Sequence, residues 1–236
     1  METKTIDKAT ELWQLDKDKE AIEVLKSLNL EINAKANTLI GKILIGAERG
    51  ISNIKKDTVN GIAHLKLGLK LGDSEAGLEL AKIFYFGKGV RKSDKKAEEY
   101  WTLSYKLGDE LAGFELANFY YDDLHGKITE AIKIFNELIE KKEFEENCYY
   151  KLFKIFEKGI GGIEPNKELS LKYLEKGATK SHVGSCMTLG LKYYRGDGIK
   201  QDIKKAIEIV ERVREAEFFK EEVNVILSKM LNNEKI

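Results

Sequence analysis

Residues 76–90 read AGLELAKIFYFGKGV, and residues 185–199 read SCMTLGLKYYRGDGI. Both stretches place a small residue, a leucine, a second small residue and an aromatic residue at offsets 0, +4, +5 and +8. These offsets lie on one face of an α-helix. A Gly-x-Gly follows each stretch and is typical of a helix end, because glycine adopts the left-handed conformation most easily. Each stretch therefore predicts a helix that a glycine turn closes.

A second helix is predicted after each of these turns. In the copies that start at 76 and 185, an alanine recurs 21 residues after the first small position. Asp57, Asn166 and Asp202 lie four residues before the small position of a second helix, and Asp and Asn are preferred N-cap residues. Gly72 and Gly108 are placed to close such helices. The repeating unit is therefore a helical hairpin.

Weaker copies of the same pattern start at Ala36, Ala112 and Cys148, so five units start near residues 36, 76, 112, 148 and 185. A helical hairpin of about 36 residues, repeated in tandem, predicts an α-solenoid in which each unit buries its apolar face against its neighbours. We predict an all-α, right-handed solenoid superhelix that forms one domain over 1–236. It comprises an N-terminal capping hairpin at 1–32, the five repeats at 33–217 and a C-terminal capping helix at 218–236.

The pattern A-x-x-x-L-G-x-x-Y-x-x-G-x-G-V, followed by D-x-x-K-A-x-x-W/Y and a closing glycine, resembles the Sel-one-like repeat (SLR) family. This family is a relative of the tetratricopeptide repeats (TPR). The resemblance covers roughly 33–217 and is strongest in the copies that start at Ala76 and Ser185. The Ala112 copy departs from it, since residues 122–126 replace the Gly-x-Gly. The resemblance implies a non-enzymatic scaffold or adaptor, often bacterial, that holds a protein or peptide on the inner surface of the solenoid.

In TPR-like solenoids the first helix of each unit lines the inner groove. Aligning the two families assigns offsets +2, +6, +9 and +10 to that surface. The resemblance thus implies a partner-binding set that alternates aromatic residues with lysine or asparagine. The set consists of Lys82, Tyr85, Phe114, Asn118, Tyr121, Tyr150, Lys154 and Tyr194. The alternative interpretation is that these tyrosines pack against neighbouring helices and that the lysines are only solvated.

Composition narrows the class of protein. The chain has one proline in 236 residues, where average usage would give about twelve, and this fits helices joined by glycine turns. Its 40 basic and 40 acidic residues leave no global field for nucleic acid or acidic membranes. The chain has two cysteines, no apolar signal core at its start and no apolar run of membrane-spanning length. We therefore expect a cytoplasmic protein without a membrane span.

Residues that would support catalysis are not arranged for it. His64, His125 and His182 occur without a His-x-x-x-His or Cys-x-x-Cys partner. Cys148 and Cys186 fall at or beside small packing positions, which predicts buried structural thiols. The Gly-x-Gly turns follow no strand and lack the continuation of a phosphate-binding loop. We expect no enzyme activity, no cofactor and no bound metal.

Two narrower functions remain as alternatives to the scaffold. Repeat proteins that resemble this one can serve as immunity-type inhibitors of a bacterial toxin or secreted effector. Some members of the family have been described as binding or hydrolysing β-lactams, although no nucleophile-base pair supports this here. The sequence gives neither the identity of the partner nor the oligomeric state.

Overall fold

The computed structural model describes residues 2–46, 55–122 and 126–234. Thirteen α-helices and one short 3-10 helix account for the regular structure of these residues, and there is no strand among them. The all-α prediction is confirmed. The hand of the superhelix and the single domain over 1–236 stay predictions.

The chain divides into two compact units, unit 1 at Met1–Leu116 and unit 2 at Ala117–Ile236. Unit 1 contains α1 (Glu2–Gln14), α2 (Asp18–Lys26), α3 (Ala34–Gly46), α4 (Thr58–Lys70), α5 (Ser74–Phe86), α6 (Asp94–Lys106) and the first part of α7 (Glu110–Tyr121). Unit 2 contains the rest of α7, then α8 (Ile128–Glu140), α9 (Glu145–Lys158), the 3-10 helix Ile160–Gly162, α10 (Lys167–Thr179), α11 (Val183–Arg195), α12 (Ile203–Glu211) and α13 (Lys220–Leu231).

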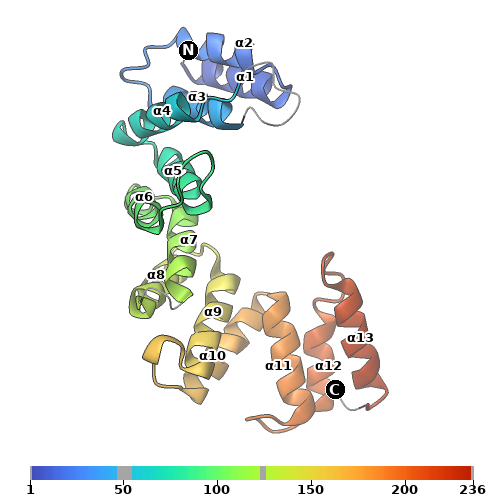
Figure 1. Cartoon of the computed structure of the whole chain (residues 1–236). Helices are drawn as coiled ribbons and strands as arrows, with labels where there is room; N and C mark the ends of the chain where they lie inside the picture. Colours follow the sequence, from blue (N-terminus) through green and yellow to red (C-terminus); the bar gives the residue numbers. More distant parts are fainter. Residues whose placement is uncertain (1, 47–54, 123–125, 235–236) are drawn as a thin grey trace. The chain divides into compact units, whose positions relative to one another are not determined.

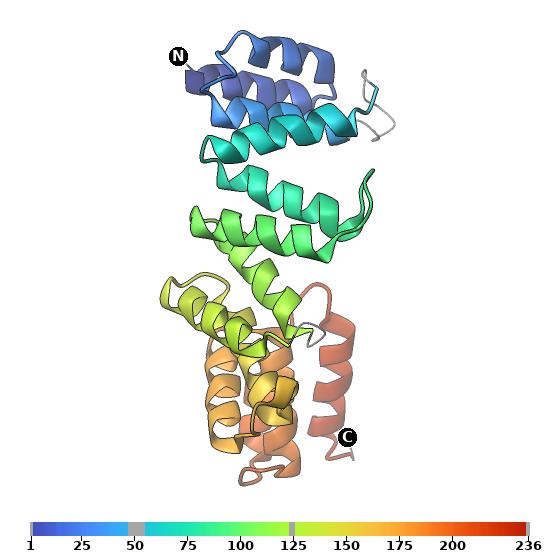
Figure 2. The same ribbon diagram turned by 60° about the vertical axis from the view of Figure 1, so that its left-hand side comes forward.

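Consecutive helices pack as hairpins. The closest packing joins α1 to α2, α3 to α4, α5 to α6, α9 to α10 and α11 to α12. Figure 1 shows these pairs in chain order, and Figure 2 shows α1 to α6 from another side. The α1–α2 hairpin packs against α3 at the start of unit 1, and α13 packs against α12 at the end of unit 2.

The small residues of the motif lie where the two helices of a hairpin cross. A Cβ atom added to Gly41 on α3 would lie 2.8 Å from the backbone oxygen of Gly61 on α4. A Cβ atom added to Gly190 on α11 would lie 2.3 Å from Cγ2 of Val210 and 3.2 Å from the backbone oxygen of Ala206, both on α12. Side chains at these positions would push the helices apart, because protein interiors are close-packed.

The predicted helix ends are confirmed by their hydrogen bonds. The side chains of Asp57, Asn166 and Asp202 accept from the backbone N–H groups three residues later, at 3.0, 2.9 and 2.9 Å. Gly87 and Gly196 end α5 and α11 in the left-handed conformation, with φ of 69° and 71°. These contacts satisfy backbone groups that a helix end otherwise leaves without partners.

Each unit has its own hydrophobic core. The core at the start of unit 1 is built from α1, α2 and α3 around Leu25, Ile40 and Ile43. The core at the end of unit 2 is built from α9 to α13 around Leu174 and Val210. On the last helix, Val223, Leu227 and Met230 are buried, whereas Leu231 and the N-cap residue Phe219 are exposed.

Candidate partner-binding surfaces

First helices line a hollow in unit 1. This N-terminal hollow has a volume of about 650 Å³ and is lined mainly by residues of α1, α3 and α5, together with Leu65 of α4 and residues of the turns beside these helices. Trp13, Ile45 and Ile83 supply apolar surface. The lining contains four lysines, namely Lys42, Lys56, Lys82 and Lys88, and one acid, Glu79. The hollow is therefore apolar at its base and positively charged at its rim.

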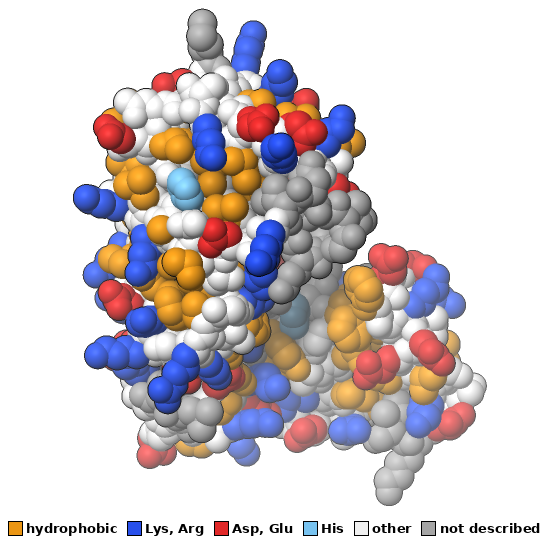
Figure 3. All heavy atoms as spheres, turned by 45° about the horizontal axis from the view of Figure 1, so that its top comes forward, with side chains coloured by type: hydrophobic (Ala, Val, Ile, Leu, Met, Phe, Trp, Pro, Cys, Tyr) orange, Lys and Arg blue, Asp and Glu red, His pale blue; other side chains and the backbone are white. Residues whose placement is uncertain are grey.

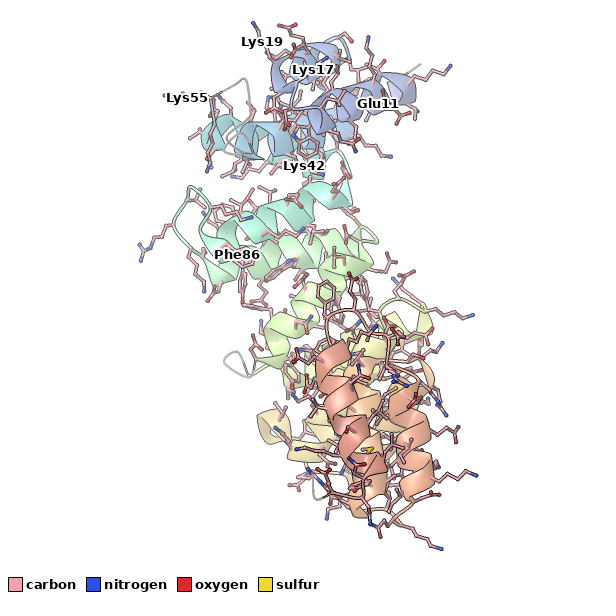
Figure 4. The ribbon with its side chains drawn as sticks, turned by 90° about the vertical axis from the view of Figure 1, so that its right-hand side faces the viewer. Glu11, Lys17, Lys19, Lys42, Lys55 and Phe86 are labelled. Carbon is pink, nitrogen blue, oxygen red and sulfur yellow. The ribbon has the colours of Figure 1, made fainter. Side chains whose placement is uncertain are left out.

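Ion pairs organise part of that rim. The Lys42 ammonium on α3 pairs with Glu75 on α5 and lies 5.2 Å from the ring centroid of Trp13. In Figure 4, Lys42 lies on the side of α3 nearer α5, far from Lys17 and Lys19. Lys82 donates to Glu79 across 3.0 Å, within one turn of α5. Exposed pairs of this kind contribute little stability, so the rim can exchange these partners for the carboxylates of a ligand.

First helices also line a hollow in unit 2. This C-terminal hollow has a volume of about 370 Å³ and is lined by α9, α11 and the turn after α11. Tyr150, Phe153 and Leu191 supply apolar surface. Its charged lining residues are Lys154, Lys158, Lys192, Arg195, Glu157 and Asp197. As in unit 1, basic residues outnumber acidic ones.

Glu157 is held inside the C-terminal hollow by two donors. Lys192 Nζ donates to one carboxylate oxygen and Ser170 Oγ to the other, each across 2.8 Å. Burial opposes ionisation of the carboxyl, but these hydrogen bonds outweigh it and hold the pKa of Glu157 below its usual range. Glu157 is therefore an internal counter-ion that removes Lys192 from the set of cations open to a partner.

Three residues of the predicted set line these hollows. Lys82 lies in the N-terminal hollow, and Tyr150 and Lys154 lie in the C-terminal one. Lys154 Nζ lies 5.6 Å from the ring centroid of Tyr150, and the His182 ring lies 4.7 Å from the same ring. The repeat register thus brings aromatic and cationic groups together on α9.

Tyr121 extends this group in unit 2. Lys151 Nζ lies 4.2 Å from the Tyr121 ring centroid, close enough for a cation–π interaction. Burial raises the pKa of Tyr121, and the charge of Asp122 and the phenol of Tyr150 act in the same direction. Asn118, on the same helix, is half-buried. Neither Tyr121 nor Asn118 belongs to the lining of the C-terminal hollow.

Tyr85 and Phe114 are half-buried in unit 1 and do not line the N-terminal hollow. The Tyr85 ring packs 5.0 Å from Phe86 and 5.1 Å from Trp101, between ring centroids. Figure 4 shows Phe86 at the end of α5. For Tyr85 the alternative interpretation, packing against a neighbouring helix, accounts for much of its surface.

The prediction for Tyr194 is corrected by the structure. Tyr194 is 7% exposed and belongs to the core of unit 2. Its hydroxyl donates to the backbone oxygen of Glu234 across 2.8 Å. The chain that follows α13 covers the face that Tyr194 would have offered to a partner. Tyr194 is therefore a core residue in this structure.

The sequence reasoning missed Trp13 as a lining residue. It lies on α1, outside the five repeats, so no repeat offset assigned it to the inner surface. Lys192 was also missed, because it lies at offset +7, next to a position assigned to the groove. A capping hairpin that packs on the first repeat extends the same surface by one helix.

The two cysteines and the two histidines that the structure describes have structural roles. Cys148 and Cys186 are buried free thiols, and burial raises the pKa of Cys148 to about 12. His64 Nδ1 lies 2.9 Å from Asn37 Oδ1, and His182 Nδ1 accepts the N-cap hydrogen bond of α11 from Ser185 N–H. His125 lies outside the described residues.

Among the described residues, no three His, Cys, Asp or Glu side chains are grouped so that they could hold a metal ion. No helix within the described ranges is long and apolar enough to cross a bilayer.

Helical hairpins that cross at small residues and end at glycines define this chain as a helical-repeat protein. A family model for the Sel1 repeat matches residues 74–109, 147–182 and 185–212. The chain belongs to the Sel1 repeat (SLR) family. The copies that start at Ala36 and Ala112 lie outside the matched residues, although α3 and α4 of the first copy pack as a hairpin.

Solved structures share this fold. A Sel1 repeat protein from Oxalobacter formigenes superposes with a TM-score of 0.72 at 18% identity, over 88% of this chain and 84% of that one. A protective antigen of uropathogenic Escherichia coli strains, which displays an SLR fold, superposes with a TM-score of 0.65 at 21% identity. That match covers 89% of this chain and 44% of the antigen, so this chain spans less than half of its length. No curated protein matches the sequence.

Proposed function

We propose that this protein is a non-enzymatic scaffold that binds an acidic segment of a partner protein on its first helices. The observation that carries this proposal is the lining of the two hollows. Each unit offers an apolar base with more basic than acidic side chains around it, although the whole chain has no net charge. A local excess of positive charge, on a chain without net charge, favours a negatively charged ligand at that place.

The chemistry of the linings supports a protein ligand. Tyrosine and tryptophan give large contact areas with a polar edge, and residues of this kind carry much of the binding energy at protein interfaces. Trp13 in unit 1 and Tyr150 in unit 2 occupy such places, each within 6 Å of a lysine ammonium. Lysines beside aromatic rings can pair with Asp and Glu side chains while the rings contact the apolar part of the ligand.

The proposal is tested by affinity capture from the native host with matched variants of the full chain. The first double variant is Lys42→Glu with Lys82→Glu, and the second is Tyr150→Ala with Lys154→Glu. The control is Lys35→Glu, which changes an exposed lysine of α3 outside the hollow lining. The partner should be captured by the wild-type chain and the control and lost from at least one double variant. A partner that both double variants capture as well as wild type, while circular dichroism shows them folded, would contradict the proposal.

A further inference from the structure

A second apolar surface lies on unit 1, away from the N-terminal hollow. This second-helix patch is formed by Leu69 on α4, by Tyr100 and Leu103 on α6 and by Leu107, the C-cap residue of α6. Lys66, Lys70 and Lys106 surround it. It encloses a shallow depression of about 400 Å³ and shares no lining residue with the N-terminal hollow. It lies on second helices, so the proposed scaffold surface does not account for it.

The base of the patch is fixed by close packing on α5. A Cβ atom on Gly77 would lie 3.1 Å from Leu69 Cδ1 and 2.9 Å from Ser104 Cβ, so the missing side chain lets α4 and α6 both approach α5. The hydroxyl of Ser104 donates to the backbone oxygen of Ser74 across 2.7 Å. The Tyr100 ring stacks on Phe84 with centroids 5.6 Å apart. The patch is therefore preorganised, which lowers the entropy lost when a ligand binds.

The patch is both open and apolar. Leu103 on α6 is 39% exposed, and Leu107, the C-cap residue that follows it by one helical turn, is 47% exposed. Figure 3 shows one face of the molecule, where apolar side chains lie among lysines and arginines rather than in one large patch. Leu103 and Leu107 remain exposed beside Tyr100 and Leu69, so a ligand that covers this local apolar surface would remove it from water.

The rim of the patch is positively charged. Lys66, Lys70 and Lys106 are exposed, and within the described residues no acidic side chain forms an ion pair with any of them. The lining includes no Asp or Glu. Burial raises the pKa of Tyr100, and the charge of Glu99, which is not a lining residue, acts in the same direction. The rim therefore complements carboxylates.

The backbone hydrogen bonds of α4 and α6 indicate whether the patch fits a helical or an extended ligand. The middle turns of α4 and α6 use their N–H and C=O groups within the helices, so they offer no edge for an extended strand to pair with. A helix satisfies its own backbone and can lay apolar side chains at i, i+3, i+4 and i+7 into a groove between two helices. We propose that the second-helix patch docks an acidic amphipathic helix of a partner protein.

The test uses displayed helices as the probe. A library of peptides about 18 residues long, a length that supports helix formation, varies apolar residues along one face and fixes glutamate at the flanking positions. It is selected against the full chain, beside a library with lysine at the same flanks. Binders from the glutamate library should lose at least about tenfold in affinity on Leu103→Lys, and likewise on Lys66→Glu with Lys70→Glu. They should bind the Leu15→Lys control like wild type, since Leu15 is 66% exposed and outside the patch.

Several results would overturn this assignment. One is a glutamate library without binders, and another is a set of binders unaffected by the patch variants while circular dichroism shows those variants folded. Preferential selection from the lysine library would contradict the charge argument. Dimerisation of the full chain that Leu103→Lys abolishes would assign the patch to a second copy. Binding to phosphatidylserine vesicles that Lys66→Glu with Lys70→Glu abolishes would assign it to a membrane surface.

Discussion

The copies that start at Ala76 in unit 1 and at Ser185 in unit 2 share almost every motif position, yet they bury different aromatic residues. In the first copy Phe84 is 6% exposed and Tyr85 is half-buried. In the second copy Tyr194, the equivalent of Tyr85, is 7% exposed, and Tyr193 is the half-buried one. The difference lies in the neighbours. The second copy is followed by α13 and the chain end, whose backbone accepts a hydrogen bond from Tyr194.

The two units also differ in how their second helices end. The same backbone hydrogen bond, from the residue after the turn to the carbonyl five residues earlier, follows α4, α6, α8 and α10. In unit 1 the turn residue is Gly72 or Gly108, each with φ of 96°. In unit 2 it is Lys142 with φ of 61° or Ser181 with φ of 58°. One turn geometry is thus built with glycine in unit 1 and with strained side-chain-bearing residues in unit 2.

The largest expected effect separates the two equivalent tyrosines. Tyr194→Ala should lower the free energy of unfolding by about 3–5 kcal/mol, because it empties a buried aromatic position. Tyr85→Ala should lower it by about 1–2 kcal/mol, since Tyr85 is half-exposed. Urea unfolding followed by circular dichroism measures both. Equal losses would show that the repeat position, and not the neighbouring helix, decides the burial of this residue.

The second prediction concerns the helix crossing at offset +5, where the copy that starts at Ala76 has Ala81 and the copy that starts at Ser185 has Gly190. Gly190→Ala should destabilise the chain by about 1–3 kcal/mol, because the new methyl group overlaps the buried Val210 side chain. The same substitution in a Val210→Ala background should cost less, which a double-mutant cycle measures. If the free-energy changes of Gly190→Ala and Val210→Ala are strictly additive, then residues 190 and 210 are not in contact at the helix crossing.

The third prediction concerns the turn residues with positive φ, Gly72 in unit 1 and Ser181 in unit 2. Ser181→Gly should raise the free energy of unfolding by up to about 1 kcal/mol, since glycine adopts positive φ without the steric cost of a Cβ. Gly72→Ala should lower it by about 1 kcal/mol for the same reason. Urea midpoints compare the two variants with wild type. Two shifts of the same sign would be inconsistent with strain at the turn in unit 2.

A smaller, pH-dependent effect is expected from His182 at the start of α11. Burial lowers the pKa of His182, against a weaker opposing effect of Glu146, and protonation would remove the acceptor of the N-cap hydrogen bond. The unfolded chain keeps an ordinary pKa of about 6.5, so below that pH the unfolded state binds the proton more readily. The free energy of unfolding should fall as the pH drops through about 6.5.

His182→Asn serves as the matched variant for that measurement, because asparagine retains an N-cap acceptor without titrating. It should reduce the loss of stability between pH 7.5 and pH 5.5, two buffer values chosen to bracket about 6.5. The remaining loss includes His64, whose pKa is lowered in the same direction by burial and then by Lys26. An unchanged pH profile in His182→Asn would rule out this role.

Some lining residues of the two hollows could be predicted from the spacing of residues in the repeat, because a single helix fixes their positions. Lys82, Tyr150 and Lys154 sit on first helices at offsets that a single helix fixes, and all three line a hollow. Trp13 could not be found this way, because it belongs to the capping hairpin and reaches the surface through the packing of α1 on α3. Whether Lys192 is open to a partner depends on its hydrogen bond to Glu157, which lies 35 residues earlier in the chain.

The helices, their ends and the positions at which they cross could be predicted from the repeat pattern alone. These features depend on contacts within one hairpin, such as the N-cap of Asp57 or the approach of Gly41 to Gly61. Which face of a repeat stays open to solvent depends on how the repeats pack against their neighbours. Whether Tyr85 or Tyr194 meets solvent depends on the element that packs next, and that contact lies between segments that the repeat pattern does not relate.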